Sequence, residues 1–138
     1  MRSELLAELR ALVLAADRPS MTDIHRRLTA LARRRGWRPP ARATLYAALA
    51  TLEGSRHEVA RLPPPVRAAL YNLAPDAMVP GHQLAFYCFN YGSLAAMSYA
   101  AGLPWLDLYQ AGRARGWRPR SRGLLAAALR ARRTGRQP

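Results

Sequence analysis

The chain repeats one pentapeptide: Arg35-Gly36-Trp37-Arg38-Pro39 returns as Arg115-Gly116-Trp117-Arg118-Pro119, at an offset of 80 residues. The repeat is longer than the pentapeptide, because segments 33–49 and 113–129 are identical at eleven of their seventeen positions. In each copy a glycine suited to a left-handed helix end follows arginines, and a proline then favours the start of the next helix. The repeat predicts two helix–turn–helix arrangements whose turns are anchored by Gly36, Trp37 and Pro39 and by Gly116, Trp117 and Pro119.

Apolar residues recur with helical spacing on both sides of each copy. The spacing predicts N-terminal helices at 3–17, 20–35 and 40–53, with Ser3 and Ser20 as N-caps. It predicts C-terminal helices at 93–101, 104–115 and 119–133. Between these groups we expect a helix through Val66, Leu70 and Leu73 and another at 82–91. Helices 82–91 and 93–101 are apolar nearly all round, so both are expected to be buried.

The predicted fold is all-α, with two tandem three-helix units packed around a central apolar helical hairpin. The sequence allows two structures for segment 56–62, a short turn or a one-hairpin wing, because its two apolar residues, Val59 and Leu62, are too few to decide between them. The expected organisation is an N-terminal helix–turn–helix unit at 1–62, connecting helices at 63–91, a C-terminal unit at 92–133 and a basic tail at 134–138.

The charge is large and unevenly distributed. The formal net charge is +14, and all 22 basic residues are arginine. Residues 68–112 contain no arginine, whereas the segments before and after them are both strongly basic. A compact domain with this charge is expected to bind a polyanion.

Three features of the N-terminal part indicate a known motif. They are Gly36, the Pro39-Pro40 helix start and the run Ala41-Arg42-Ala43-Thr44-Leu45-Tyr46. Segment 3–55 resembles the helix–turn–helix of the tri-helical or winged-helix superfamily. The resemblance implies that the third helix enters the major groove of DNA. It implies base or phosphate contacts from Arg42, Thr44 and Tyr46, and phosphate contacts from Arg33, Arg34, Arg35 and Arg38.

The second copy offers an equivalent basic surface, formed by Arg115, Arg118, Arg120 and Arg122 together with Ser121. Arg42 and Arg122 lie one turn inside their predicted helices, where neither a helix dipole nor a cap needs a cation. Their presence in both copies therefore predicts that they serve an external anion. Ala101-Gly102-Leu103 also resembles the tight turn of the motif. The helix after it is expected to expose Asp107, so we interpret this turn as core architecture.

No enzyme class is indicated. His25, His57 and His82 show no metal-ligand spacing, and no phosphate-binding loop or metal motif is present. Cys88, between Tyr87 and Phe89, is expected to be a small buried side chain. We predict no catalysis, no cofactor and no metal. The single cysteine and the early acidic residues predict a cytoplasmic protein without a signal peptide.

The middle of the chain is apolar and rich in aromatic residues. Thirty residues between Asp76 and Asp107 carry no formal charge, but proline and glycine interrupt them, so we predict a buried hairpin and no membrane segment. An excess of aromatic residues predicts a homodimer interface through 82–106. These residues are Phe86, Tyr87, Phe89, Tyr91 and Tyr99.

The sequence thus predicts a DNA-binding protein, either a transcriptional regulator or a DNA-organising factor. Arginine-rich turns and helix starts would contact duplex DNA. Two alternatives remain open. One is a protein-interaction module, such as an antitoxin or inhibitor, that uses the central apolar surface, and the other is an RNA-binding protein.

Overall fold

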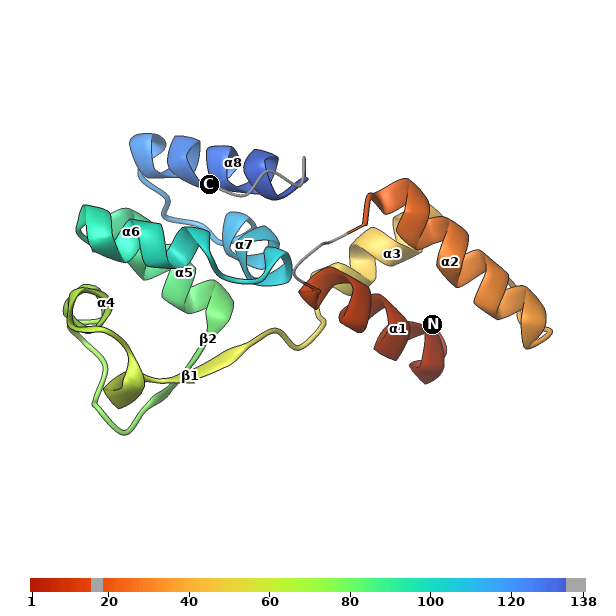
Figure 1. Ribbon diagram of the computed structural model, residues 1–138, viewed down its shortest axis with the longest axis horizontal. Helices are drawn as coiled ribbons and strands as arrows, with labels where there is room; N and C mark the ends of the chain where they lie inside the picture. Colours follow the sequence, from red (N-terminus) through yellow and green to blue (C-terminus); the bar gives the residue numbers. More distant parts are fainter. Residues whose placement is uncertain (16–18, 134–138) are drawn as a thin grey trace. The chain divides into compact units, whose positions relative to one another are not determined.

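The chain is mostly helical. The computed structural model describes residues 1–15 and 19–133, apart from the side chains of residues 132 and 133. These residues form eight α-helices and one small two-stranded sheet, with 65% helix (Figure 1). The prediction of an all-α fold is confirmed, while the tandem three-helix arrangement stays a prediction. The chain divides into two compact units, unit 1 (Met1–Glu53) and unit 2 (Gly54–Pro138). No helix within the described ranges has both the length and the apolar character needed to cross a membrane.

Unit 1 contains α1 (Ser3–Leu14), α2 (Met21–Arg34) and α3 (Arg42–Leu49). One apolar stripe of each helix forms its core. The buried members are Leu5, Leu9, Leu12, Val13, Ile24, Leu28, Ala32, Leu45 and Leu49. Ser20 caps α2 as predicted, because its hydroxyl oxygen accepts the backbone N–H of Asp23 at 3.1 Å. Ser3 is not a cap: it is the first residue of α1 and follows Arg2. α1 ends at Leu14 and Ala15 is extended, so the predicted helix 3–17 is too long, and residues 16–18 lie outside the described part of the chain.

The third helix is shorter than predicted, since α3 begins at Arg42 and not at residue 40. Pro40 disfavours the helical conformation at Pro39, which precedes it, and Ala41 is the extended N-cap residue of α3. The Pro40 carbonyl oxygen also lies 3.0 Å from His25 Nε2 on α2, close enough to accept a hydrogen bond from the ring. The two prolines therefore form an extended connection along α2 before the helix can start.

Unit 2 begins with a pair of short strands. β1 (Arg56–Glu58) runs antiparallel to β2 (Met78–Pro80), with His57 opposite Val79. The 3-10 helix η1 (Val59–Arg61) and α4 (Pro64–Ala69) lie between them along the chain. Segment 56–62 is therefore neither an isolated turn nor a hairpin of its own, because the strand that pairs with it comes only after α4.

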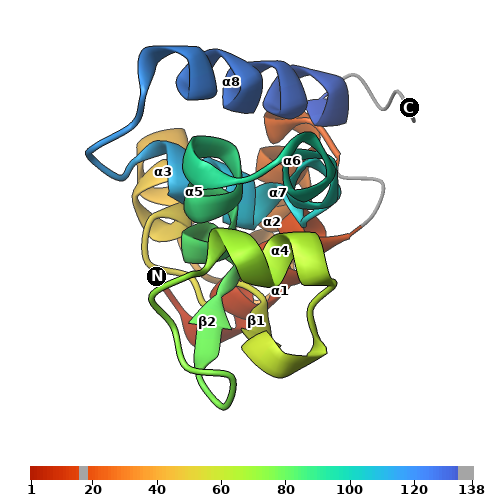
Figure 2. The ribbon, with the colours of Figure 1, turned by 90° about the vertical axis from the view of Figure 1, so that its left-hand side faces the viewer.

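The central helix of unit 2 is α5 (Gly81–Tyr91). α6 (Leu94–Ala101), α7 (Trp105–Gly112) and α8 (Pro119–Arg133) all pack against it (Figure 2). Cys88 on α5 is fully buried, as predicted. Burial raises the pKa of its thiol to about 11, so the group stays protonated and unreactive at neutral pH.

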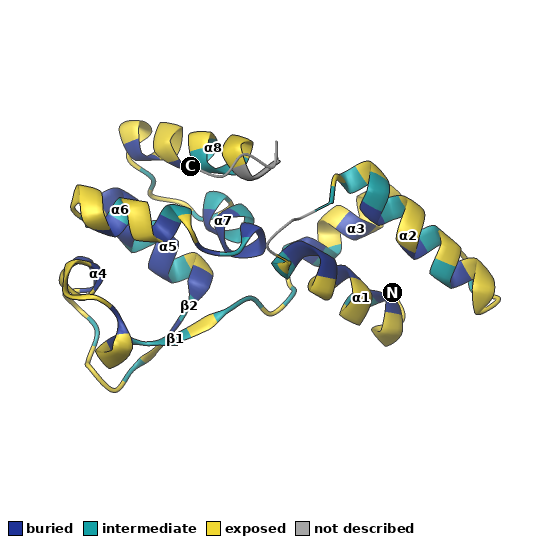
Figure 3. Ribbon diagram, in the orientation of Figure 1, coloured by how far each residue is buried: buried dark blue, intermediate teal, exposed yellow. Residues whose placement is uncertain are grey.

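The next helix, α6, is less buried than its composition suggests. Only Ala96 and Ala100 of this helix are buried, whereas Leu94 is 78% exposed and Tyr99 is 36% exposed (Figure 3). A short helix that packs through one face leaves its other face in solvent, whatever residues stand there. The expectation that this helix is buried all round is therefore wrong.

Candidate nucleic-acid interface

The first pentapeptide forms the turn that ends α2. Arg35 is the C-cap residue, and Gly36 follows in the left-handed conformation, with φ of +71°. The N–H of Gly36 donates to the Arg33 carbonyl at 3.1 Å, and that of Trp37 donates to the Ala32 carbonyl at 2.8 Å. This pair of bonds is the Schellman pattern, which satisfies the last carbonyls of a helix. The arginines of the first copy are thus held at the end of a well-closed helix.

The second pentapeptide has a different setting, although Gly116 is again left-handed, with φ of +93°. α7 ends at Gly112, so Arg113 and Arg115 follow the helix and do not form its last turn. The predicted helix 104–115 is therefore too long by one turn. α8 begins at Pro119 itself. Arg120 stands where the first copy has a second proline, so the constraint that delays α3 is absent.

The two tryptophans are both half-buried but contact different groups. In unit 1 the guanidinium of Arg2 lies 4.6 Å from the centroid of the Trp37 ring. In unit 2 the Trp117 ring packs against Phe86 and Phe89, with centroid distances of 5.3 and 6.2 Å. The Trp117 indole N–H also donates to the Ala111 carbonyl at 2.9 Å. Trp117 is thus fixed by aromatic packing and a hydrogen bond in addition to a cation, since the Arg122 guanidinium lies 5.8 Å from its ring centroid, whereas Trp37 is contacted by the Arg2 cation.

The arginines that the sequence assigned to DNA in unit 1 are all exposed. Arg33 and Arg34 occupy the last turn of α2, and Arg38 lies in the turn that follows. Their guanidinium groups form no ion pair with a carboxylate in the described part of the chain. Arg35 differs, because it donates to the Glu4 carboxylate at 2.9 Å and is partly neutralised. Three of these four charges are therefore available to an external anion.

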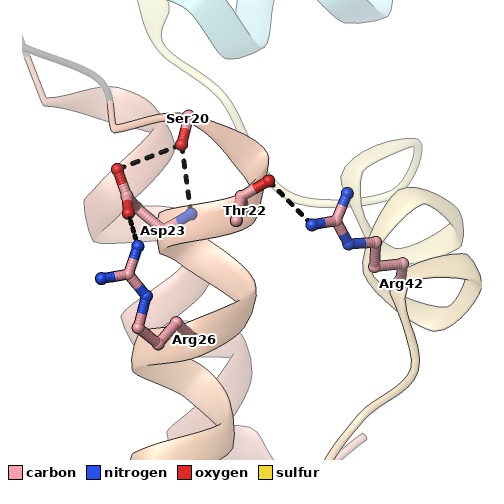
Figure 4. Close-up of polar contacts among 5 residues, drawn as sticks. All are labelled: Ser20, Thr22, Asp23, Arg26 and Arg42. Carbon is pink, nitrogen blue, oxygen red and sulfur yellow. Dashed lines mark hydrogen bonds and ion pairs between the residues drawn. The ribbon is translucent and has the colours of Figure 1, made fainter.

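Arg42 reaches back from the first residue of α3 to α2, where its Nη2 donates to Thr22 Oγ1 at 2.8 Å (Figure 4). It does not lie one turn inside its helix, as the sequence predicted. In the same view Asp23 forms an ion pair with Arg26, whose side chain is 71% exposed. An ion pair so open to water contributes little energy and leaves Arg26 able to change partner.

Thr44 and Tyr46, the other residues proposed to contact DNA from α3, are also exposed. Tyr46 keeps 40% of its surface in solvent. Leu45 and Leu49 of the same helix are fully buried. Thr44 and Tyr46 stand directly before and after Leu45, so they lie on the two flanks of the buried stripe of α3 and reach solvent on either side of it.

Two grooves lie along α2 and differ in charge. One has a volume of about 510 Å³ and is lined by Glu4 and Glu8 as well as by Arg27 and Arg34. The other, of about 360 Å³, has no carboxylate in its lining. It is lined by Thr22, His25, Arg26, Thr29, Arg33 and Arg42, with Ala30 at its base. We call it the α2 groove, and its arginines and hydroxyls suit a phosphate.

The basic residues of the second copy are exposed as well, but they have internal partners. The Arg122 guanidinium lies 3.3 Å from the Gly112 carbonyl oxygen and 3.5 Å from that of Ala114, at the end of α7. A cation there satisfies free carbonyls and is favoured by the helix dipole. The expectation that no helix end uses Arg122 is therefore wrong. Ser121, grouped with these arginines by the sequence, is only 6% exposed.

The remaining arginines of the second copy lie around the turn. Arg115 and Arg120 are exposed, and their guanidinium groups form no ion pair with a carboxylate that the structure describes. The Arg118 side chain lies over the Tyr91 ring, 4.8 Å from its centroid. Its backbone N–H donates to Asn90 Oδ1 at 2.9 Å. The structure thus brings Arg118 together with the end of α5, a contact that the sequence did not predict.

The sequence also missed a buried polar cluster at the start of α7. Asp107 is fully buried, not exposed as predicted, and accepts the backbone N–H and the hydroxyl of Ser55 at 3.1 and 2.5 Å. The same hydroxyl oxygen lies 2.8 Å from His57 Nε2. A side chain at Gly54 or Gly81 would collide with the carboxylate, so both positions require glycine.

This cluster joins β1 and α7, whose residues lie 52 positions apart in the sequence, and no local pattern could reveal it. Serine stands between the carboxylate and the histidine. In a nucleophilic triad the histidine stands between them and takes the serine proton. The arrangement in this chain therefore holds the serine hydroxyl in place and does not activate it.

Among the residues described, no three His, Cys, Asp or Glu side chains gather into a set that could hold a metal ion. Comparison of the chain with protein-family models, curated proteins and solved structures gave no match. The α2 groove and the two basic turns remain the places where charge and geometry together point to a ligand.

Proposed function

We propose that the protein binds duplex DNA through the arginines of unit 1, as a transcriptional regulator or a DNA-organising factor. The observation that carries the proposal is the α2 groove, where Arg26, Arg33 and Arg42 surround a space without a carboxylate. Arg34 and Arg38 add exposed charge at the same helix end and turn. Guanidinium groups bind phosphate oxygens through two parallel hydrogen bonds, so this surface suits a DNA backbone.

In the proposed complex, a phosphate occupies the α2 groove and α3 lies against the bases. Arg42 would exchange its bond to Thr22 for a phosphate, while Thr44 and Tyr46 would face the base edges. Charged groups are abundant on this surface and candidate base readers are few. Most of the affinity should therefore come from phosphates and depend weakly on sequence.

Titration of labelled duplex DNA at several salt concentrations tests the proposal. Neutralising about five to eight phosphates should give a slope of about −4 to −7 in a plot of log K against log salt. Arg33→Ala should weaken binding and flatten the slope by about one unit. Arg61→Ala is the matched control, because Arg61 is exposed in unit 2 and already paired with Glu58 at 3.0 Å. An affinity independent of salt would contradict the proposal. Structured RNA in the same titration tests the RNA-binding alternative.

We also propose that the exposed face of α6 pairs two copies of the chain, as expected for 82–106. The support is the exposure of Leu94 and Tyr99, both on α6 within that stretch. Two apolar side chains left in water at one helix favour association with an apolar partner. Leu94→Asp should convert a dimer to a monomer in sedimentation at micromolar concentration. If the wild-type chain is monomeric, the homodimer proposal is wrong, and the exposed face of α6 would instead support the alternative of a protein-interaction module.

A further inference from the structure

The end of α5 carries an exposed aromatic and basic surface. We define the tyrosine–arginine surface by Tyr71, which follows α4, Tyr91 at the end of α5, and Arg118 in the second pentapeptide. Tyr71 is 73% exposed and Tyr91 is 43% exposed. Their ring centroids are 6.4 Å apart, and the rings are nearly perpendicular, at 88°. Three segments far apart in the sequence therefore meet at one aromatic site on unit 2.

The guanidinium of Arg118 lies over one of these rings, 4.8 Å from the Tyr91 centroid. A guanidinium plane stacked on a tyrosine ring leaves its donors free at the edges, where they can bind phosphate. Tyr71, by contrast, meets only the Tyr91 ring among the described aromatic side chains. Most of its ring surface remains open to solvent, and its apolar face has no role in the core.

The site is rigidly supported from below. Asn90 is 4% exposed; its Nδ2 donates to the Phe86 carbonyl, and its Oδ1 accepts the Arg118 backbone N–H, each at 2.9 Å. The Tyr87 ring packs beside the Tyr91 ring, with centroids 5.8 Å apart, and Asn72 Nδ2 donates to the Tyr87 hydroxyl at 3.2 Å. The Asn90 bonds hold the Arg118 backbone at the end of α5, and Tyr87 packs beside Tyr91, so this part of the site is in place before any ligand binds, which lowers the entropy lost on binding.

The charge around the site favours an anionic partner. From residue 108 to the end of the sequence the chain has nine arginines and no acidic residue. Arg115 and Arg120 flank Arg118 and are exposed. Aromatic rings set among arginines are the composition of surfaces that bind single-stranded nucleic acids, where bases stack on rings and arginines follow the backbone.

We propose that the tyrosine–arginine surface binds single-stranded DNA by stacking an unpaired base on Tyr71. Bases inside a duplex are stacked on both faces and cannot offer a face to a protein ring, so this site selects unpaired nucleotides. The phosphates next to the stacked base lie within the field of Arg118 and its neighbours. The inference rests on the proposed function in taking DNA as the polyanion, but it uses a different site and a different form of the strand.

The test compares three fluorescent probes of equal length with the full chain. They are an oligothymidylate of about twelve nucleotides, an abasic strand with the same phosphates, and a duplex. Tyr71→Ala should weaken oligothymidylate binding about 5- to 150-fold, the range expected for one lost stacking contact. It should leave the abasic strand and the duplex unchanged. Tyr71→Phe, which keeps the ring, should retain binding.

Met78→Ala is the control, because Met78 is an exposed side chain of unit 2, 51% in solvent, that lies outside both proposed sites. Circular dichroism should show that Tyr71→Ala folds normally, since the ring is mostly in solvent. Equal wild-type affinity for oligothymidylate and the abasic strand overturns the inference, as does a Tyr71→Ala variant that binds both as the wild type does. Duplex binding that persists in either case keeps the proposed function. Loss of duplex binding by Arg33→Ala alone concerns unit 1 and leaves this site unaffected.

Discussion

The two copies of Arg-Gly-Trp-Arg-Pro share five residues and a left-handed glycine, yet they are held by different forces. In unit 1 the turn is closed by backbone bonds of α2, and Trp37 is covered by the cation of Arg2. In unit 2 the turn is fixed by α5, through the Asn90 side chain and through Phe86 against Trp117. The second arginine of the pentapeptide therefore lies in an exposed turn in unit 1, as Arg38, and over the Tyr91 ring in unit 2, as Arg118.

The two units that contain the copies also differ in their buried polar side chains. Among the described residues, the buried polar side chains are Asn90, Asp107 and Ser121, all of them in unit 2. A buried polar group must be paired, so it fixes the position of its partner more strictly than apolar contact does. Unit 2 thus holds its basic turn at a defined place, whereas unit 1 relies on capping and an exposed ion pair. Four experiments would sharpen or break this contrast.

The largest effect is expected from removing the tryptophan of the second copy. Trp117→Ala should lower the free energy of unfolding by about 3 kcal/mol, because two aromatic contacts and a hydrogen bond are lost. Trp37→Ala should cost less, about 1–2 kcal/mol, because the ring is half-buried and its aromatic face is contacted by a solvated cation. Urea unfolding followed by circular dichroism measures both. Equal losses would mean that the two turns are anchored alike.

The buried amide should be the next most sensitive position. Asn90→Ala leaves the Arg118 N–H and the Phe86 carbonyl without their partner and should cost about 1–3 kcal/mol. Asn72→Ala is the control, because this exposed amide bonds to a tyrosine hydroxyl at the surface; its cost should stay within about 0.5 kcal/mol. The same urea titration compares them. If the two variants lose equal stability, Asn90 does not anchor the second copy.

Arg42 and Arg122, which occupy equivalent positions in the two copies, should affect stability and DNA binding differently. Arg122→Ala should cost about 0.5–1 kcal/mol, because it caps the end of α7, while Arg42→Ala should stay within about 0.5 kcal/mol. The effects on duplex DNA binding should have the opposite order. Arg42→Ala should flatten the salt slope by about one unit, and Arg122→Ala should change it less. Thermal unfolding and DNA titration of both variants test this. Normal DNA binding by Arg42→Ala would remove it from the proposed interface.

The smallest effect concerns the start of α3. Pro40→Ala removes the constraint that keeps residue 39 extended, so α3 should extend toward its N-terminus and resemble the start of α8. The Cα chemical shifts at positions 40 and 41 should then move toward helical values, with little change in unfolding free energy. Unchanged shifts would mean that the contact between His25 and the residue 40 carbonyl, not the proline, delays the helix.

Local chemistry made much of this chain predictable from its sequence. Apolar spacing located the eight helices approximately, although α4 ends at Ala69, before the predicted Leu70 and Leu73. Ser20 acts as the predicted cap because it bonds only three residues ahead. Helix ends were less predictable, as α1, α3 and α7 show, since helix ends depend on single residues and their neighbours in space. The exposed arginines were foreseen for the same local reason, because helix ends and turns are seldom buried.

Tertiary structure alone decided which residues meet. Asp107 looks like a surface residue in the sequence, yet it is buried against Ser55, 52 residues away, and against Gly54 and Gly81. Leu94 looks like a core residue, yet no neighbour covers its face of α6. Tyr71, Tyr91 and Arg118 come from three separate segments. Spacing along a chain reports on contacts within one helix turn, and contacts between distant segments depend on how the helices pack.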